Sequence, residues 1–214
     1  MNLRHLTSAF TALVLTGTAL GAVTAPAQSA EKQAVGTRSL AKVLAADGNR
    51  FDSNPRDFDI LDRAIRTVLK AKPDSPVAVL KDGKVALTAF APTDQAFRLL
   101  AQEVSGSKIK SERKVYATLA QVADVNTTEQ LLLYHAVPGK TITYKQAKAS
   151  DGAKLKTGTG ANLTVRVRSG IVSLVDADKN DRNARVIPKL KNINKGNRQI
   201  AHGIDRVLRP FDLP

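Results

Sequence analysis

The spacing of the apolar residues changes part-way along the chain, and this change limits the folds open to it. In residues 58–69 the apolar side chains recur every three or four positions, the period of an amphipathic helix. In residues 163–168 they alternate with polar ones, as in a strand with one buried face. Helical periods dominate before Pro138 and strand periods dominate after it. This order predicts an α+β fold, because an α/β fold would alternate helices and strands throughout.

The first part of the chain is predicted to be mainly helical, and two helix starts are recognisable. Thr93 is placed to cap a helix, and Asp94 follows it in the first turn, where the helix dipole favours a negative charge. Thr127, followed three residues later by Gln130, predicts a capping box. The predicted helical segments are residues 39–47, 58–72, 93–104, 111–125 and 126–137.

Strands are predicted at one early place and then along most of the second part. Residues 77–90 read as a strand, a Lys-Asp-Gly turn and a second strand. Residues 162–177 read as a hairpin that turns at Ser169 and Gly170 and carries basic side chains on one face. Residues 184–193 and 198–211 are predicted to add further strands.

The first 30 residues have the layout of a secretory signal peptide: a basic start, a short apolar run and then small residues. The apolar run of about 15 residues is shorter than the ~20 that a helix needs to span a bilayer. We therefore expect a signal peptide at 1–30, a lead-in at 31–38 and one domain at 39–214. The chain contains no cysteine, so neither a disulfide framework nor a lipid-modified cysteine is available. A protein secreted to the extracellular space or the cell envelope is the expectation.

Positive charge is concentrated in the second part of the chain. Residues 31–137 carry 16 basic and 13 acidic side chains, whereas residues 138–214 carry 16 basic and 6 acidic ones. Five basic residues share one polar stretch and could bind phosphate or sulfate groups of an acidic polymer; they are Arg185, Lys189, Lys191, Lys195 and Arg198. The alternative is a surface that only keeps the protein soluble. Specific reading of nucleic acid is not expected, since no groove-entering helix module is present.

The sequence lacks the residue patterns that are typical of catalytic, metal-binding and cofactor-binding sites. Only His135 and His202 follow the predicted signal peptide, and no Gly-x-Ser-x-Gly sequence or cysteine nucleophile accompanies them. Residues 176–183 imitate a calcium loop, but Asp181 stands at the turn position that requires glycine, and Ile187 stands where a bidentate glutamate belongs. We expect no catalytic site, no metal site and no cofactor, and two partly buried, hydrogen-bonded histidines.

Three segments match one known pattern in order and spacing. They are "TAFAPTDQAF" at 88–97, "LLLYHAVPGK" at 131–140 and "QIAHGIDRVLRP" at 199–210. Together they resemble the first conserved motif, the tyrosine-histidine motif and the second conserved motif of the fasciclin domain, and the chain looks like a single-domain secreted bacterial member. The resemblance implies a fasciclin-like wedge of β-strands with several helices packed against it.

The resemblance also implies a role in adhesion and a set of interaction residues. In animal relatives the tyrosine-histidine motif and the second motif are tied to integrin binding, which points here to Tyr134 and His135 and, more loosely, to His202, Ile204 and Asp205. The sequence departs from that pattern at residues 192–194 and 197–199, and it has no Arg-Gly-Asp, so integrin itself is not the expected partner.

Three functions follow as hypotheses from the sequence. The first is a monomeric, non-catalytic adhesion module that binds a protein or an acidic polysaccharide at the cell surface or in the matrix. The second is polyanion binding through the basic C-terminal part. The third is an enzyme or small-ligand carrier that uses His135 or His202, and it requires a pocket beside one of them. Whether Tyr134 and His135 face a partner or brace the interior is left open by the sequence.

Overall fold

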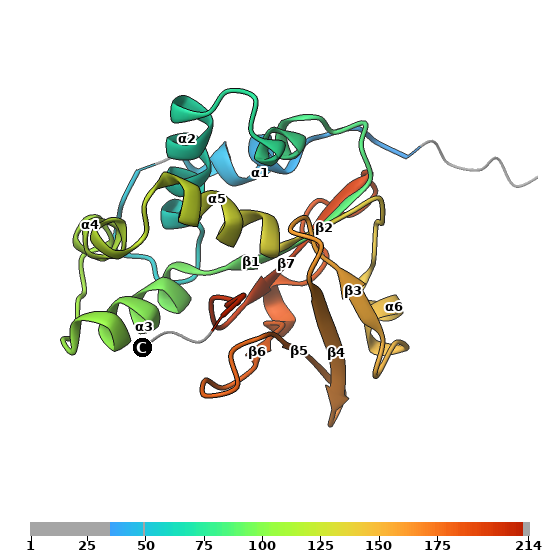
Figure 1. Ribbon diagram of the computed structural model, residues 1–214. Helices are drawn as coiled ribbons and strands as arrows, with labels where there is room; N and C mark the ends of the chain where they lie inside the picture. The colour runs from blue at the N-terminus through green and yellow to red at the C-terminus, as the bar shows by residue number, and fades with distance from the viewer. Residues whose placement is uncertain (1–34, 49, 212–214) are drawn as a thin grey trace, which may run out of the picture. The chain divides into compact units, whose positions relative to one another are not determined.

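The computed structural model describes residues 35–48 and 50–211, which form two β-sheets and a set of helices (Figure 1). The predicted signal peptide and the first four residues of the predicted lead-in lie outside these residues. The end of the lead-in is bonded to the domain. The backbone N–H of Gly36 donates to the carbonyl of Gly196 at 2.8 Å, and that of Arg38 donates to Oδ1 of Asn197 at 2.9 Å.

The elements confirm the α+β fold, with helices mainly in the first part and strands mainly in the second. The α-helices are α1 (Leu40–Leu44), α2 (Asp59–Ala71), α3 (Asp94–Ser105), α4 (Glu112–Val122), α5 (Val125–Tyr134) and α6 (Tyr144–Lys148), and three 3-10 turns cover Ala45–Asp47, Pro76–Lys81 and Pro188–Leu190. The strands are β1 (Leu87–Pro92), β2 (Ala136–Pro138), β3 (Lys154–Lys156), β4 (Asn162–Arg168), β5 (Ile171–Val175), β6 (Ala184–Arg185) and β7 (Gln199–Ile204).

The two sheets differ in how their strands pair. In the three-stranded sheet the order is β2-β1-β7, with β1 antiparallel to β2 and parallel to β7. The four-stranded sheet, β3-β4-β5-β6, is antiparallel throughout. An isolated bridge between Val186 and Ile204 connects them. All six residues of β7 are buried, so this strand lies inside the domain.

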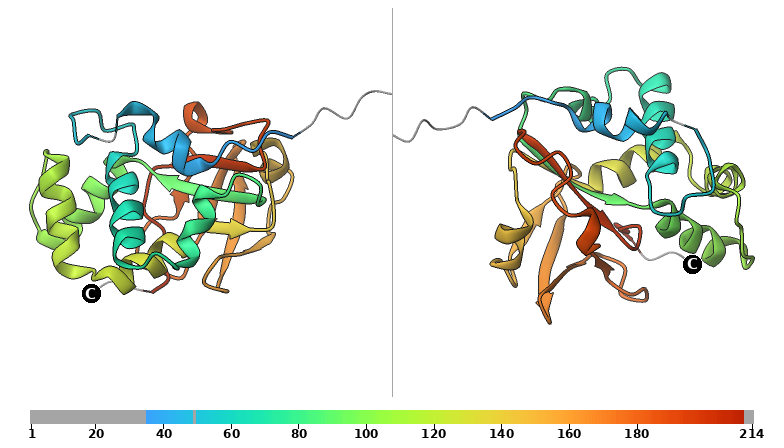
Figure 2. Two further views of the ribbon diagram at one scale, coloured as in Figure 1. Left: turned by 90° about the horizontal axis from the view of Figure 1, so that it is seen from above. Right: turned by 180° about the vertical axis from the view of Figure 1, so that it is seen from behind.

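The three-stranded sheet separates two hydrophobic cores. Leu87 and Ala91 of β1 pack with α1, α2 and α5, whereas Phe90 packs with Val165 and other residues of the second sheet. The alternation follows from the period of two along a strand. Figure 2 shows α1–α5 gathered on one side of β1 and β7, and the strands β3–β6 on the other.

Several predicted elements are confirmed together with the local chemistry that forms them. Helix α2 follows the predicted amphipathic segment and buries one face. Thr93 caps α3, since its Oγ1 accepts a hydrogen bond from the backbone N–H of Ala96 at 3.4 Å. The predicted hairpin is present as β4 and β5, and Ser169 and Gly170 at its turn have φ angles of 49° and 75°.

Residues 77–80 were predicted as a strand, and that prediction is wrong. They belong to the 3-10 turn Pro76–Lys81. Pro76 has its φ fixed near the helical value, and Oγ of Ser75 accepts a hydrogen bond from the N–H of Val77 at 3.2 Å. Val77 and Leu80, three positions apart, are both buried, which is the spacing of a turn of helix. Ser75 and Pro76, which start a helical turn, therefore outweigh the strand preference of the β-branched valines.

Other boundaries also differ from the prediction, including the strand predicted over 198–211, which ends at Ile204 as β7. Helix α5 is capped by Asp124, whose Oδ1 accepts from the N–H of Thr127 at 2.7 Å, so the predicted capping box at Thr127 is wrong. Residues 184–193 were predicted as one strand, but β6 contains two residues and Pro188 begins a 3-10 turn, because proline cannot donate to a strand ladder. None of the helices in the described residues is long and apolar enough to cross a membrane.

Candidate functional site

The tyrosine-histidine pair lies at the junction between α5 and β2. Tyr134 is the last residue of α5, and its side chain is fully buried in the core of the second sheet. Burial, reinforced by the nearby charge of Asp176, raises the pKa of the Tyr134 hydroxyl to about 12. The phenol therefore stays neutral, and its ring acts as part of the core.

His135 uses both ring nitrogens to bind backbone groups. Its Nε2 accepts a hydrogen bond from the N–H of Leu208 at 2.9 Å, and since that N–H can only donate, the ring proton is on Nδ1. Nδ1 donates to the carbonyl of Leu131 at 2.7 Å. Burial lowers the pKa of His135 to about 4. The neutral ring thus ties α5 to the segment that follows β7.

His202 is arranged in the same way in the middle of β7. Its Nδ1 accepts from the N–H of Asn192 at 3.3 Å, and its Nε2 donates to the carbonyl of Ile142 at 2.8 Å. Burial lowers its pKa below the usual range. The ring is stacked on Phe90, with the centroids 6.0 Å apart. Both histidines are therefore neutral cross-links between segments that are distant in sequence.

The other two residues taken from the second motif divide between the interior and the surface. Ile204 is fully buried in the core of the second sheet. Asp205 is partly exposed, and its Oδ1 accepts from the backbone N–H of Arg185 at 2.6 Å. Four of the five predicted interaction side chains are therefore buried in the free domain. A Ser or Thr hydroxyl does not hydrogen-bond to either histidine in the described residues.

The five basic residues singled out in the sequence are all exposed. Arg185 lies on β6, Lys189 lies in the following 3-10 turn, and the other three lie between that turn and the start of β7. Within the described part of the chain, none of the five forms an ion pair. Lys191 Nζ lies 5.2 Å from the centre of the Tyr144 ring. These cations are therefore available to an outside anion.

The loop that carries Lys195 and Arg198 is held in place by a buried asparagine. Asn194 has a φ of 66° and is 6% exposed. Its Nδ2 donates to the carbonyls of Arg38 at 2.7 Å and Gln199 at 2.9 Å. The backbone beneath the basic side chains is thus fixed by bonds to both neighbouring segments.

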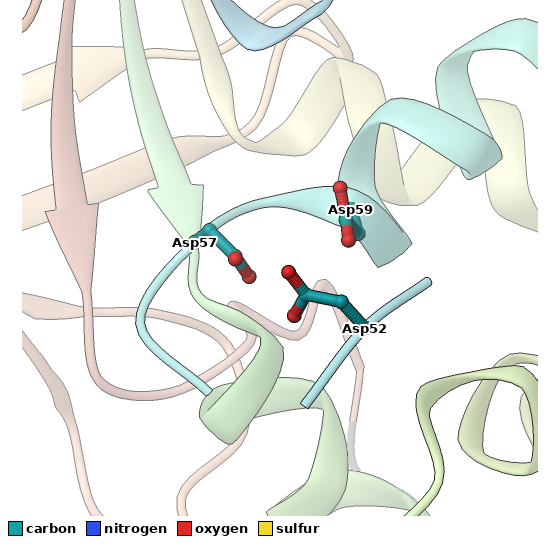
Figure 3. Close-up of side chains that lie close together, drawn as sticks. All are labelled: Asp52, Asp57 and Asp59. Carbon is teal, nitrogen blue, oxygen red and sulfur yellow. The ribbon is translucent and has the colours of Figure 1, made fainter. Parts of the chain in front are cut away.

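A cluster of carboxylates lies where three helices begin. Asp59, Asp94 and Glu112 are the first residues of α2, α3 and α4, and all three are buried. Figure 3 shows Asp52 and Asp57, from the segment before α2, close to Asp59 at the start of that helix. Oxygens of these three residues lie within 4.8 Å of one another, and so do oxygens of Asp57, Asp94 and Glu112. Oxygens at this spacing can bind a cation or share a proton.

The carboxylates nearest the interior are stabilised by hydrogen bonds and, in Asp94, by a bound proton. Oδ1 of Asp94 accepts from the N–H of Ile60 at 3.0 Å, and Glu112 accepts from Arg98 at 2.8 Å and from the N–H of Asp52 at 2.7 Å. Burial, together with a hydrogen bond to Asp57, raises the pKa of Asp94 to about 8, so Asp94 carries a proton at neutral pH. Burial also raises the pKa of Glu112.

Local sequence patterns do not predict this cluster. The segment that imitates a metal-binding loop is residues 176–183, where Asp178 instead accepts from the backbone of Asn180 at 2.9 Å and from Arg209 at 2.9 Å. The sequence signal for the cluster is an acidic residue in the first turn of three predicted helices. For Asp94 this signal is explained by the helix dipole alone. That the three helix starts converge is visible only in the tertiary structure.

Comparison with known proteins supports the fold. The family model described as the fasciclin domain matches residues 66–210. In structure the chain is similar to a FAS1 domain pair from the insect cell adhesion molecule fasciclin I, with a TM-score of 0.51 and 16% sequence identity. The match covers 73% of this chain and 48% of that chain, so this chain spans about half the length of the pair. No curated protein matches the sequence.

Proposed function

The chain belongs to the fasciclin domain family, and we propose that it is a secreted, non-catalytic interaction and adhesion module of the cell surface or the extracellular matrix. Domains of this family are generally adhesion and interaction modules. The observation that carries the proposal is the family match over residues 66–210. Secretion rests on the signal-like layout of residues 1–30.

The histidines of the motifs support a non-catalytic role. General base catalysis needs a ring nitrogen that can reach a substrate proton. In His135 and His202 both nitrogens are bound to backbone groups, and burial favours the neutral form. We assign Tyr134, His135, His202 and Ile204 to the architecture of the domain and place the adhesive contacts on exposed residues, of which Asp205 is the motif member.

The test of adhesion compares a buried motif residue with an exposed one. Labelled protein is applied to immobilised matrix proteins and to cell-envelope fractions, with unlabelled protein as competitor. His202→Gln, checked for native circular dichroism, is expected to bind as the wild type does, while Asp205→Lys is expected to weaken the competed binding. If the natively folded His202→Gln variant loses the competed binding, the architectural role of His202 is contradicted. If the wild type shows no competed binding, adhesion to these surfaces is contradicted.

A second candidate function is the binding of an acidic polymer, and a specific observation favours it. Arg185, Lys189, Lys191, Lys195 and Arg198 are exposed and without ion pairs in the described structure. Free cations on a fixed loop bind phosphate or sulfate groups through charge, and the affinity then falls as salt rises.

Elution from immobilised heparin tests this second function. The variant Lys189→Gln/Lys195→Gln/Arg198→Gln is expected to elute at clearly lower salt than the wild type. The control Lys70→Gln/Lys81→Gln/Lys84→Gln removes the same charge from exposed positions in the first part of the chain and is expected to elute close to the wild type. Equal shifts in the two variants would show that net charge alone, and not this loop, governs binding.

A further inference from the structure

A large cavity lies among helices α2, α3, α4 and α5 and the residues 207–211 that follow β7. Helix α5 packs on α2, α3 packs on α4, and α2 also contacts α3 and α4, so the cavity is bounded by helices that pack on one another. Its volume is about 670 Å³. Ligand pockets for small molecules span roughly 300–1,000 Å³, so the space suits one molecule of that kind.

The wall of this cavity is mainly apolar. Representative side chains from its five sides are Leu61, Leu100, Leu119, Leu131 and Val207. Side chains that face an empty volume lose the dispersion contacts that a packed core would give them. Apolar cavities stay dry and take up apolar molecules. The wall therefore favours a hydrocarbon-rich occupant over water.

Exposed apolar side chains gather at the same cavity. Among the described residues, six large hydrophobic side chains are exposed, and three of them, Val104, Val122 and Phe211, line it. They come from α3, from the end of α4 and from the segment after β7. Apolar side chains that remain in water beside a cavity are typical of a ligand entrance.

Charges on the wall exclude an anionic ligand. Arg209 is the one basic residue among the lining residues, and it is already paired with Asp178 at 2.9 Å and with Glu103. Glu103 and Asp124 add two carboxylates to the wall. A ligand carboxylate or phosphate would therefore meet like charge and no free cation. A cationic ligand is disfavoured in turn by the net charge of +14 that the chain carries, so the wall suits an uncharged molecule.

One hydroxyl donor is left to orient a ligand. Oγ1 of Thr67 and the hydroxyl oxygen of Tyr116 lie 2.7 Å apart, and both residues line the cavity. One of the two hydroxyls donates to the other, which leaves one hydroxyl hydrogen for an acceptor on the ligand. His135 also lines the cavity but contributes no free nitrogen, because the backbone of Leu131 and Leu208 occupies both.

We propose that the cavity among α2–α5 binds an uncharged, mainly hydrocarbon small molecule that carries one hydrogen-bond acceptor. This function goes beyond the proposed adhesion, and it is separate from polyanion binding because the cavity shares none of its lining residues with the basic loop. The pocket that a small-ligand carrier requires beside His135 is present, and the histidine serves as wall and not as a reacting group.

The probe for the test is the uncharged ketone dye prodan, whose fluorescence rises in apolar surroundings. The chain has no tryptophan, so dye emission is measured without energy transfer from that residue in the wild type. We expect saturable binding of one dye per protein. Dodecanol is expected to displace the dye, whereas dodecanoate, which has the same chain with an anionic head, should need about tenfold more at a salt concentration that screens surface charge.

Two cavity-filling variants locate the dye, and one surface variant serves as the control. Leu131→Trp and Ala64→Leu each add side-chain volume on the cavity wall, and each is expected to weaken dye binding at least tenfold while the circular dichroism stays native. Val85→Trp adds the same large ring at an exposed position outside the cavity and is expected to bind as the wild type does. Thr67→Val with Tyr116→Phe removes the donor and is expected to weaken binding about fivefold.

The proposal is overturned by any of three results. The first is the absence of saturable dye binding by the wild type. The second is equal binding by Leu131→Trp, Ala64→Leu and Val85→Trp, which would put the dye elsewhere. The third is displacement by dodecanoate as effective as that by dodecanol, which would contradict the uncharged ligand. If one filling variant is not natively folded, the other decides the second result.

Discussion

The charges beside helices α2–α5 and the charges of the loop at residues 185–198 are arranged in opposite ways. Around the helices, Asp94, Glu112 and Arg209 are buried and paired by hydrogen bonds, ion pairs or a proton. On the loop, five cations are exposed and without ion pairs in the described structure. Buried charges must be compensated within the fold, whereas exposed ones remain free for other molecules. The first group therefore determines stability, and the second is available for binding.

The largest expected effect comes from the same substitution made at one arginine of each region. Arg209→Met leaves the buried Asp178 without its partner, and breaking a buried pair costs about 3–5 kcal/mol of the free energy of unfolding. Arg198→Met removes an exposed, unpaired charge, and we expect a change of about 0.5 kcal/mol or less. Denaturant unfolding measures both. Similar losses in the two variants would break the comparison between the regions.

Asp94 is expected to make stability fall as pH rises. Its pKa is about 8 in the folded protein, above the ordinary value of 3.8 that the unfolded chain has. Between these values the folded state holds a proton that the unfolded state lacks, so the contribution of Asp94 to stability is largest below pH 3.8 and is lost progressively up to pH 8.

The matched variant is Asp94→Asn, which imitates the protonated carboxyl. At pH 9 it is expected to be several kcal/mol more stable than the wild type, because each unit between the folded and unfolded pKa corresponds to about 1.4 kcal/mol, while near pH 4 the two should differ little. Thermal unfolding across this range measures the difference, with and without EDTA. A proton needs no metal, so EDTA should leave the midpoint unchanged. A drop with EDTA in the wild type alone would instead assign a bound cation to the carboxylates Asp57, Asp94 and Glu112.

His135 is expected to have the opposite effect, so that its contribution to stability falls as pH decreases. Its folded pKa of about 4 lies below the ordinary value of 6.5, so the unfolded state binds more protons between these values. Its contribution to stability is complete above pH 6.5 and is lost as pH falls to 4. The variant His135→Phe removes this dependence and leaves the N–H of Leu208 unpaired, at a cost of about 2 kcal/mol at pH 7.

The smallest effect on stability is expected for the triple variant of the basic loop. Lys189, Lys195 and Arg198 contribute no ion pair in the described structure, so their replacement by glutamine should change the free energy of unfolding by about 0.5 kcal/mol or less. The same protein should elute earlier from heparin. A large loss of stability would show that these side chains belong with the paired charges of the helical region.

The sequence predicted elements whose signals are local. Thr93 as a cap and the amphipathic segment of α2 were recognised because the responsible residues lie within a few positions of one another. The turn at Pro76–Lys81 was missed, because valines that favour strands lie next to a serine and a proline that start a helical turn.

Features that depend on the tertiary structure could not be predicted from local sequence signals. The acidic cluster depends on the meeting of three helix starts, and the cavity depends on how α2–α5 are spaced. The motif residues Tyr134 and His135 were recognised, but their burial follows from partners such as Leu208, which lies far along the chain. The sequence identified which residues matter there and left their environment open.

The parallel pairing of β1 with β7 has a consequence for how the domain forms. Leu87 lies opposite Gln199, so strands about 110 residues apart must meet before the three-stranded sheet exists. Such long-range pairing slows folding, because the entropy of closing the loop is lost before the contacts are made. While the chain emerges from a ribosome, the sheet between the two cores cannot close until residue 204 is free. Helices and hairpins whose residues are close in sequence can therefore form early, but the domain takes its final form only when nearly the whole chain has been released.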